Sequence, residues 1–419
     1  RAGDGAGGGA MNRLALLIAG LAAACGSHGT ALDLPSRAAS PEHAAGCSVA
    51  QGSQGSQGSQ GSVDNAAPDG CGTARPEAAG SPVTAAPQAQ DDDLAVLIPL
   101  EAATLSPQTA GLGGPLVAPE LYARAFGPPG ALQRGGTPAA PALAGLRVVG
   151  LRLDPCAPAG APAGAPAATP SAPCTAQLRL VFQTVTPAPA GTADGHPTAG
   201  EDAVHAFYAL DRDQLLAAVR TIIALRHREA GDRALGALAP HPILVEQGGS
   251  GGFATALDAL VGSLAGPHNL VRLTELTSSG MGTAWNFAGV DLAAGSATPV
   301  AIAGLPASSP MIAFFAGFTP GELTGDPAFS PAPHHAADDE LARVATRAAV
   351  TARIEDPAIH TSASIDCASC HVARSLLTPE RPVNVHMFGY RGQAPSIQPR
   401  TVRETAASVA IVNALLAAR

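Results

Sequence analysis

Two cysteines and a histidine near the C-terminus form the most reactive pattern in the chain. Cys367 and Cys370 are separated by two small residues, and His371 follows at once. This C-x-x-C-H spacing lets two thiols add to the two vinyl groups of a haem, and it carries the imidazole beneath the porphyrin, where it can bind the iron. The pattern therefore predicts covalent attachment of one haem c, with these three residues binding the cofactor and His371 as a metal ligand.

Other chemistries share parts of this pattern. A C-x-x-C pair also occurs as a redox-active dithiol, as a structural disulfide and as half of a zinc site. A zinc site would need a partner pair, and the chain has no second C-x-x-C. Over residues 355–419 the chain resembles c-type cytochromes, and the resemblance implies electron transfer by a single haem. The alternative is a non-catalytic binding or scaffold protein in which the two cysteines form only a disulfide.

The sequence leaves the second axial ligand of the iron open. Met387 and His386 stand side by side downstream of the motif. Adjacent residues of an extended segment point to opposite sides, so only one of the two is expected to face the iron. A methionine thioether raises the reduction potential and suits electron transfer, whereas a second histidine lowers it. Met387 is the expected metal ligand, with His386 second and His360 third.

The N-terminal stretch has the pattern of an export signal. Residues 1–10 read as translated upstream sequence, Met11 opens a short basic region, and an apolar run then extends to Ala24. That run is too short to span a bilayer. Its end, Ala-Ala-Ala-Cys-Gly, resembles a bacterial lipoprotein box. We therefore expect residues 1–24 to be removed and Cys25 to carry a lipid anchor. A plain signal peptide is the alternative.

Export agrees with the haem motif and with the remaining cysteines. Haem c is attached outside the cytoplasm, which points to the periplasm, the outer membrane or the cell surface, and such compartments permit disulfides. Lipid and haem would occupy three of the seven cysteines, which leaves an even number. Cys156 and Cys174 lie at the neck of a hairpin between the alternating segments 146–153 and 177–185. We expect these two cysteines to form a disulfide.

A flexible tether is expected between the export signal and the folded part. Residues 25–92 have almost no apolar periodicity and contain four Gln-Gly-Ser repeats. Such a segment buries too little apolar surface to offset its ordering entropy, which predicts disorder. Cys47 and Cys71 flank the repeats, and they either close a loop or remain thiols.

The rest of the chain divides into two parts. Residues 93–335 mix strand and helix patterns without a repeating β-α order, which predicts an α+β fold with a β-rich N-terminal half. Residues 336–419 are expected to form a helical, cytochrome c-like haem segment. Period-2 or apolar runs predict strands at 94–100, 146–153, 177–185, 269–276 and 284–292, and 311–318 is a further apolar run. Helical spacing and capping pairs predict helices at 211–228, 253–264, 366–377 and 401–419.

Charge and size restrict the partners. Charged residues make up 14% of the chain and the net charge is −9, with no basic patch, so nucleic acid is not an expected partner. Electron transfer requires a redox partner protein, which the sequence does not name. Residues 93–335 are more than a haem carrier needs, and we expect them to bind a partner or ligand.

Two further patterns are weaker. Gly248–Gly252 matches G-x-S-x-G, the serine nucleophile elbow, but the parallel β-α series that surrounds such an elbow is missing. His334 and His335 stand before three acidic residues, which is a pattern shared by metal sites and solvated turns. An electron carrier is therefore favoured over an enzyme.

Overall fold

The structure is a computed structural model of the 419-residue chain. Gly80–Arg419 form one compact unit. The described residues are 88–126, 141–158, 174–189, 195–231, 233–278, 284–293, 296–300, 311–315, 348–359, 370–371, 373–376 and 386–418. Several residues singled out from the sequence lie outside them: Cys25, Cys47, Cys71, His334, His335, His360 and Cys367.

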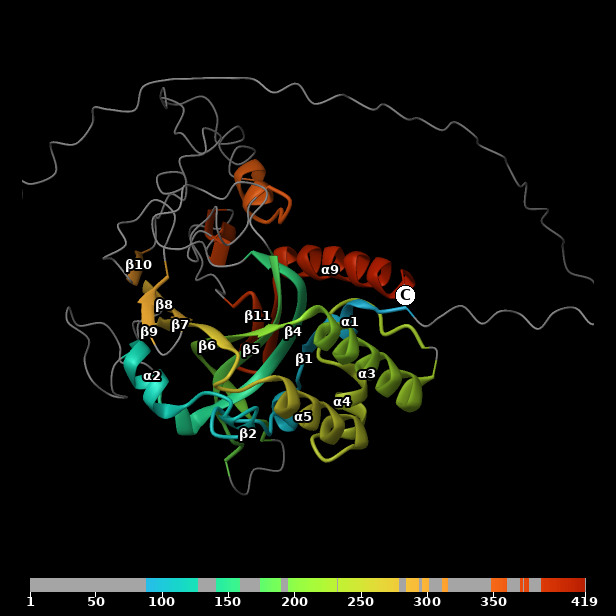
Figure 1. Ribbon diagram of the computed structural model, residues 1–419. Coiled ribbons are helices and arrows are strands. Elements are labelled where there is room, and N and C mark those ends of the chain that lie inside the picture. Colours follow the sequence, from blue (N-terminus) through green and yellow to red (C-terminus); the bar gives the residue numbers. More distant parts are fainter. Residues whose placement is uncertain are drawn as a thin grey trace, which may run out of the picture. The chain divides into compact units, whose positions relative to one another are not determined.

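An antiparallel sheet is the centre of the larger unit (Figure 1). Its strand order is β1-β4-β5-β6-β7-β8-β10, and β9 pairs with β8. Every neighbouring pair in this sheet is antiparallel. The strands are β1 (Ala95–Leu97), β4 (Leu146–Pro158), β5 (Cys174–Thr186), β6 (Thr198–Leu210), β7 (Leu270–Ser278), β8 (Ala284–Ala293), β9 (Ser296–Pro299) and β10 (Met311–Phe315). With helices around it, this sheet confirms the α+β prediction.

Alternation along β5 gives the sheet two different faces. Leu178, Leu180 and Phe182 are fully buried on what we call the first face. The residues between them, among which are Arg179 and Gln183, lie on the opposite, second face because successive side chains of a strand alternate. Register extends the two faces across the neighbouring strands, since residues paired across strands share a face.

Helices cover the first face with apolar side chains. These helices are α2 (Pro119–Phe126), α3 (Arg212–Ala230), α4 (Pro242–Gln247) and α5 (Gly252–Leu264). Figure 1 shows α3, α4 and α5 gathered beside one another, and all three contribute to a single apolar core with the strands. Leu216, Phe253 and Leu257 are among its fully buried members. Burying each such side chain contributes about 1.5–3 kcal/mol.

The ends of α3 follow the capping rules that the sequence suggested. Asp211 accepts a hydrogen bond from the Gln214 backbone at 2.7 Å, and the Gln214 side chain accepts one from the Asp211 backbone at 2.9 Å. Gly231 ends the helix with a φ of 63°, which glycine adopts without strain. The predicted helix over 211–228 is confirmed, with observed bounds Arg212–Ala230.

A buried ion pair joins α3 to the short helix α1 (Asp91–Leu94). Arg226 Nε lies 2.9 Å from Asp93 Oδ1, and both side chains are almost completely buried. Arg226 Nη2 also donates to the Gln88 carbonyl at 2.9 Å. Gln88–Asp93 are therefore part of the fold, and the prediction that the tether extends to residue 92 is wrong. The predicted strand at 94–100 is shorter too, because α1 and the 3-10 helix η1 (Leu100–Ala102) flank β1.

A small hairpin covers part of the second face. Its strands are β11 (Phe388–Arg391) and β12 (Ala394–Ile397), joined at Gly392 with a φ of 60°. Phe388 and Tyr390 pack against Val149 and Val181 in a second apolar cluster. A Cβ added at Gly150 would lie 2.9 Å from the Phe388 ring, so a glycine is needed at this crossing.

The C-terminal helix α9 (Pro399–Ala417) contacts both sides of the sheet. Val412 belongs to the first-face core, whereas Glu404 pairs with Arg152 on the second face at 3.0 Å. The predicted capping box of Thr401 and Glu404 is wrong. Pro399 occupies the first turn, so the helix begins earlier, and the Thr401 hydroxyl donates to a carbonyl outside the helix.

The C-terminal region is therefore built into the sheet unit. α9 and the β11–β12 hairpin pack on strands from the predicted α+β domain, and no division of Gly80–Arg419 falls at residue 335. The assignment of 336–419 as a cytochrome c-like haem segment stays a prediction. Shorter elements complete the unit: β2 (Ala110–Gly111), β3 (Gly114–Pro115), η2 (Leu143–Gly145) and η4 (Ala373–Leu376). Among the described helices, none has the length and apolar character needed to span a membrane.

The β4–β5 hairpin predicted from alternation is confirmed, and it carries Cys156 and Cys174 at its open end. The backbone register places Cys174 opposite Pro158, two residues from Cys156. The side chain of Cys174 is outside the described residues, so its pairing with Cys156 stays a prediction.

Candidate functional site

The described part of the C-x-x-C-H motif is held by the helical segment that precedes it. Cys370 is half-buried and packs with Ile354 and Ala373. The Thr351 hydroxyl donates to the Ala373 carbonyl at 3.2 Å, and Arg374 Nε lies 2.9 Å from Glu355 Oε1. These contacts fix the backbone on the C-terminal side of the motif. The described residues 370–371 and 373–376 are helical, as the sequence predicted for 366–377.

His371 is buried against the second face of the sheet. Its ring centre lies 6.2 Å from that of His205 on β6, and the two ring planes differ by only 19°. Phe287 on β8 contacts the same imidazole, with ring centres 5.1 Å apart. His371 therefore lies next to the middle of the sheet in space, although His205 is more than a hundred residues earlier in the sequence.

His205 is positioned by the register of β6. It pairs with Val181 on β5 and with Thr274 on β7, which places it on the second face. Its Nδ1 lies 3.4 Å from the Thr274 hydroxyl. Burial lowers the pKa of His205 well below its ordinary value, and the neighbouring His371, Arg179, His386 and Arg152 lower it further. The imidazole is therefore neutral near pH 7 and keeps a lone pair.

His386 belongs to the same cluster of imidazoles. It is 4% exposed, and its Nε2 lies 3.4 Å from the side-chain amide of Gln183. Burial, followed by His371 and Arg391, lowers the pKa of His386 to about 3, against a hydrogen bond to the Glu201 backbone that raises it. Gln183 is itself fully buried and holds Tyr390 through both backbone groups.

Met387 is half-buried, and its described contacts are made by its backbone. Its carbonyl accepts hydrogen bonds from the Gln398 backbone and from the Thr401 hydroxyl, each at 2.9 Å. Of the two downstream candidates, the described contacts bring His386 toward His371 and do not bring the thioether there. The assignment of Met387 as iron ligand stays a prediction.

Three arginines line the second face beside the histidines. Arg152 pairs with Glu404, and Arg272 forms two hydrogen bonds to the Asp291 carboxylate. Arg179 differs, because its guanidinium lies over the Phe207 ring, 4.7 Å from its centre, and has no carboxylate partner among the described residues. Burial, followed by the neighbouring Arg152, lowers the pKa of Arg179 to about 10. It stays charged and is available to an anionic group.

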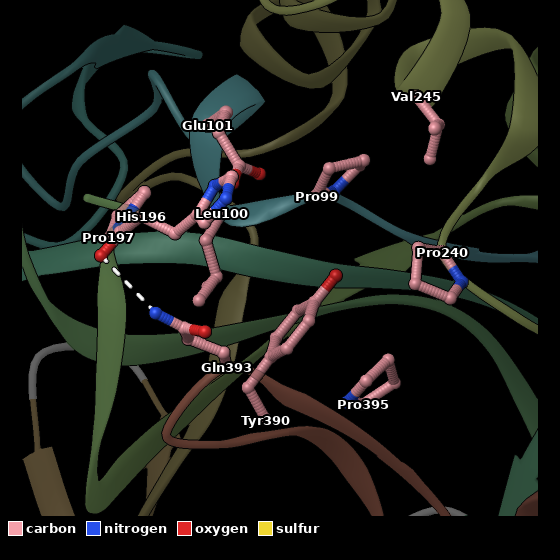
Figure 2. A pocket seen from close by; sticks show the side chains of 10 residues that line it. All are labelled: Pro99, Leu100, Glu101, His196, Pro197, Pro240, Val245, Tyr390, Gln393 and Pro395. Atoms are coloured by element: carbon pink, nitrogen blue, oxygen red, sulfur yellow. Dashed lines mark hydrogen bonds and ion pairs between the residues drawn. The ribbon is translucent and has the colours of Figure 1, made fainter. Parts of the chain in front are cut away.

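A separate hollow lies beside the β11–β12 hairpin (Figure 2). It has a volume of about 220 Å³ and is lined by four prolines, Leu100, Glu101, His196, Val245, Tyr390 and Gln393. That is smaller than the usual small-molecule site of about 300–1,000 Å³. Its polar groups are engaged: His196 with Glu101 at 3.2 Å, and the Tyr390 hydroxyl with the Ile98 carbonyl at 3.0 Å. This hollow is too small for a haem.

The serine-hydrolase pattern has the wrong structural context. Residues 243–245, which would have to form a strand before Ser250, lie in the helix α4. Ser250 is exposed in the short loop between α4 and α5. A nucleophile elbow needs a strand-to-helix turn, so Gly248–Gly252 is a helix-connecting loop.

Sequence reasoning missed His205, Phe287 and Arg179 as site residues. The signal for His205 was a polar residue between apolar ones in Thr198–Leu210, a segment for which no strand was predicted. Alternation along β5 places Arg179 on the face opposite the core. Alternation does not predict which distant residues pack on that face, and His371 comes from a distant part of the chain.

The fold and the site together define an antiparallel-sheet protein with a histidine- and arginine-bearing face, against which His371 of the C-x-x-C-H motif lies. No protein-family model, no curated protein and no solved structure matches the chain. Within the described residues, no three histidine, cysteine, aspartate or glutamate side chains gather to hold a metal ion by themselves.

Proposed function

We propose that this chain carries one covalent haem c and transfers electrons outside the cytoplasm. Thioether bonds from Cys367 and Cys370 hold the haem, and His371 binds its iron. One observation supports the proposal above the others: His371 lies 6.2 Å from a second imidazole, His205, on a polar face of the sheet. A C-x-x-C-H motif next to another imidazole has the donor set that a haem iron uses.

The surrounding residues also fit a haem. The macrocycle needs apolar walls, and Phe287 and Phe207 supply aromatic surface on the second face. The two propionate groups need positive charge, and the Arg179 guanidinium has no carboxylate partner among the described residues. Neutral imidazoles at His205 and His386 keep further positive charge away from the iron.

When bound, haem supplies an iron that accepts and releases one electron. The chain's own residues hold and orient it. Thr351 and Glu355 fix the backbone after the motif, so that His371 keeps one position against the sheet.

The test is the haem content of the exported protein. Wild-type protein, matured with the haem-attachment machinery, should give a pyridine haemochrome spectrum of thioether-linked haem, with one haem per chain. The Cys367→Ser, Cys370→Ser double variant should give none, and Cys47→Ser, a matched cysteine outside the motif, should keep it. Wild-type protein without covalent haem, in which Cys367 and Cys370 form a disulfide, would favour the scaffold alternative.

We propose further that the protein is a lipoprotein anchored through Cys25. The support is the apolar run that ends in Ala-Ala-Ala-Cys-Gly. Cys25→Ser should release the protein from the membrane fraction, and the wild-type N-terminal peptide should carry acyl chains in its mass spectrum. A wild-type protein that carries no acyl group would contradict the anchor.

A third proposal concerns the β4–β5 hairpin. The register places Cys174 opposite Pro158, two residues from Cys156, so we propose that the two cysteines pair. Closing a loop of this size stabilises a fold by about 3 kcal/mol in the chain-entropy model. Peptide mapping without reductant should recover the two cysteines in one linked peptide, and recovery of Cys174 as a thiol would refute the pairing.

A further inference from the structure

His205 and His371 are separated by the distance that two axial ligands of one metal require. An imidazole nitrogen binds a metal at about 2 Å, so two opposing imidazoles place their bonded nitrogens about 4 Å apart. Because each ring centre lies about 1 Å beyond its nitrogen, the centres are then roughly 6 Å apart. In the structure the two ring centres lie 6.2 Å apart, and the ring planes are nearly parallel, differing by 19°.

Of the two ring nitrogens of His205, the surroundings engage Nδ1, so Nε2 is the one that could bind a metal. Its Nδ1 lies within reach of the Thr274 hydroxyl, at 3.4 Å. Metal-binding histidines usually donate the N–H of their other ring nitrogen to such an acceptor, which fixes the tautomer and the ring orientation. No hydrogen bond reaches Nε2 of His205 from any described residue. The available lone pair is therefore on Nε2.

His386 is less suitable, although it lies close by. Its Nε2 is next to the Gln183 amide at 3.4 Å, and a further hydrogen bond joins it to the Glu201 backbone. Gln183 is fully buried and is tied to Tyr390, so it cannot move aside without disturbing the hairpin β11–β12. His386 thus has a structural role, namely to join the hairpin to the sheet.

We infer that His205 is the second axial ligand of the haem iron, opposite His371, and that Thr274 positions it. The inference rests on the proposed function, because it needs the haem. It replaces Met387 as the expected ligand and gives the iron two imidazoles. Such an iron has no open coordination position, which suits electron transfer and disfavours binding of small ligands.

The ligand pair would also link distant parts of the chain. His205 is in the middle of β6, and His371 is in the segment that follows the last strand of the large sheet. Haem loading would therefore connect the motif to the centre of the sheet. The haem-loaded protein should resist proteolysis between residues 348 and 376 more strongly than the haem-free Cys367→Ser, Cys370→Ser variant.

The experiment compares variants of the full-length, haem-loaded protein by absorption and electron paramagnetic resonance. His205→Gln should keep covalent haem but change the ferric iron from low-spin to high-spin, and added imidazole should restore the low-spin signal. His386→Gln and Met387→Leu are the matched controls, and both should stay low-spin. Thr274→Val should keep the low-spin state and shift its signals, since only the orientation of the ligand changes.

Wild-type protein provides a test that needs no substitution. Its near-infrared magnetic circular dichroism should show the charge-transfer band of two imidazoles and lack the one that a methionine thioether gives. Methionine-type bands, or a His205→Gln variant that stays low-spin while Met387→Leu or His386→Gln becomes high-spin, would overturn the inference and leave covalent haem intact. Wild-type protein without covalent haem would instead overturn the proposed function and the inference together.

Discussion

The two faces of the sheet are made by the same strands, yet they bury different kinds of residue. The first face is packed with Leu, Val, Ile and Phe side chains under the helices α3, α4 and α5. The second face carries Arg152, Arg179, His205 and Arg272, with a small apolar cluster at one end. Burying imidazoles and guanidinium groups costs free energy unless they are partnered. A face that keeps such residues is therefore expected to serve a site, while the opposite face supplies the stability.

The largest change in the free energy of unfolding should come from breaking the buried ion pair between Arg226 and Asp93. Arg226→Met leaves Asp93 buried without its partner, and losing one half of a buried pair costs about 3–5 kcal/mol. Chemical denaturation of the exported protein measures it. The matched control is Arg233→Met, whose partner Glu246 is exposed, and it should cost less than about 1 kcal/mol.

The contrast between the faces predicts that His205→Gln in haem-free protein changes the free energy of unfolding by less than about 1 kcal/mol. An effect as large as that of Arg226→Met would show that the second face also holds the fold together, and the functional interpretation of its histidine would lose its main support.

The next largest effect is a dependence of the free energy of unfolding on pH, caused by the buried carboxyl group of Asp92. Asp92 is 1% exposed, and burial, followed by Asp91 and Asp93, raises its pKa to about 7. Because the folded pKa lies above the unfolded one of about 3.9, folding favours the protonated carboxyl. Its contribution to stability is complete at low pH and is lost as the pH rises from about 4 to about 7.

Asp92→Asn should therefore stabilise the protein at pH 8 by on the order of 1–3 kcal/mol and have little effect at pH 4. Denaturation curves at the two pH values measure the difference. A stabilisation of equal size at both would show that Asp92 does not titrate in this range.

A smaller effect is expected at the apolar end of the second face. A Cβ at Gly150 would lie 2.9 Å from the Phe388 ring, so Gly150→Ala should displace the β11–β12 hairpin and cost about 1–3 kcal/mol. Gly145→Ala is the matched control, because its Cβ would meet Thr184 at an ordinary 3.4 Å. If the two variants unfold at the same denaturant concentration, the hairpin is not packed on the sheet as described.

The smallest effect concerns the potential of the haem. Arg179 has no carboxylate partner among the described residues, and its positive charge favours the reduced iron. Arg179→Gln should lower the midpoint potential by on the order of tens of millivolts. Arg391→Gln, whose partner Glu201 is half-exposed, should leave it nearly unchanged. A potential that does not respond to Arg179 would place the haem away from the second face.

The sequence predicted those parts of the fold that depend on local pattern. Alternation in β5 and the Asp211–Gln214 capping pair are short-range signals, and both were correct. The α9 start was misplaced because Pro399 opens the helix before Thr401. The strand β6 was missed, since Ala, Phe and Tyr next to one another blur its alternation.

Of the candidate site, the sequence predicted only the part that depends on a local pattern. His371 is recognisable from its spacing to two cysteines, which is a local signal. His205 becomes significant only when a long-range register places it across from the motif. No spacing rule connects the two residues, so the sequence offered only Met387, His386 and His360 as candidates for a second ligand.

The most direct test of the account is the mass of the peptide that contains the C-x-x-C-H motif. Exported wild-type protein, digested without reductant, should release a peptide with Cys367 and Cys370 that is heavier by one haem. Recovery of that peptide as an unmodified dithiol or an internal disulfide, from cells that attach haem to a control cytochrome, would contradict the central claim.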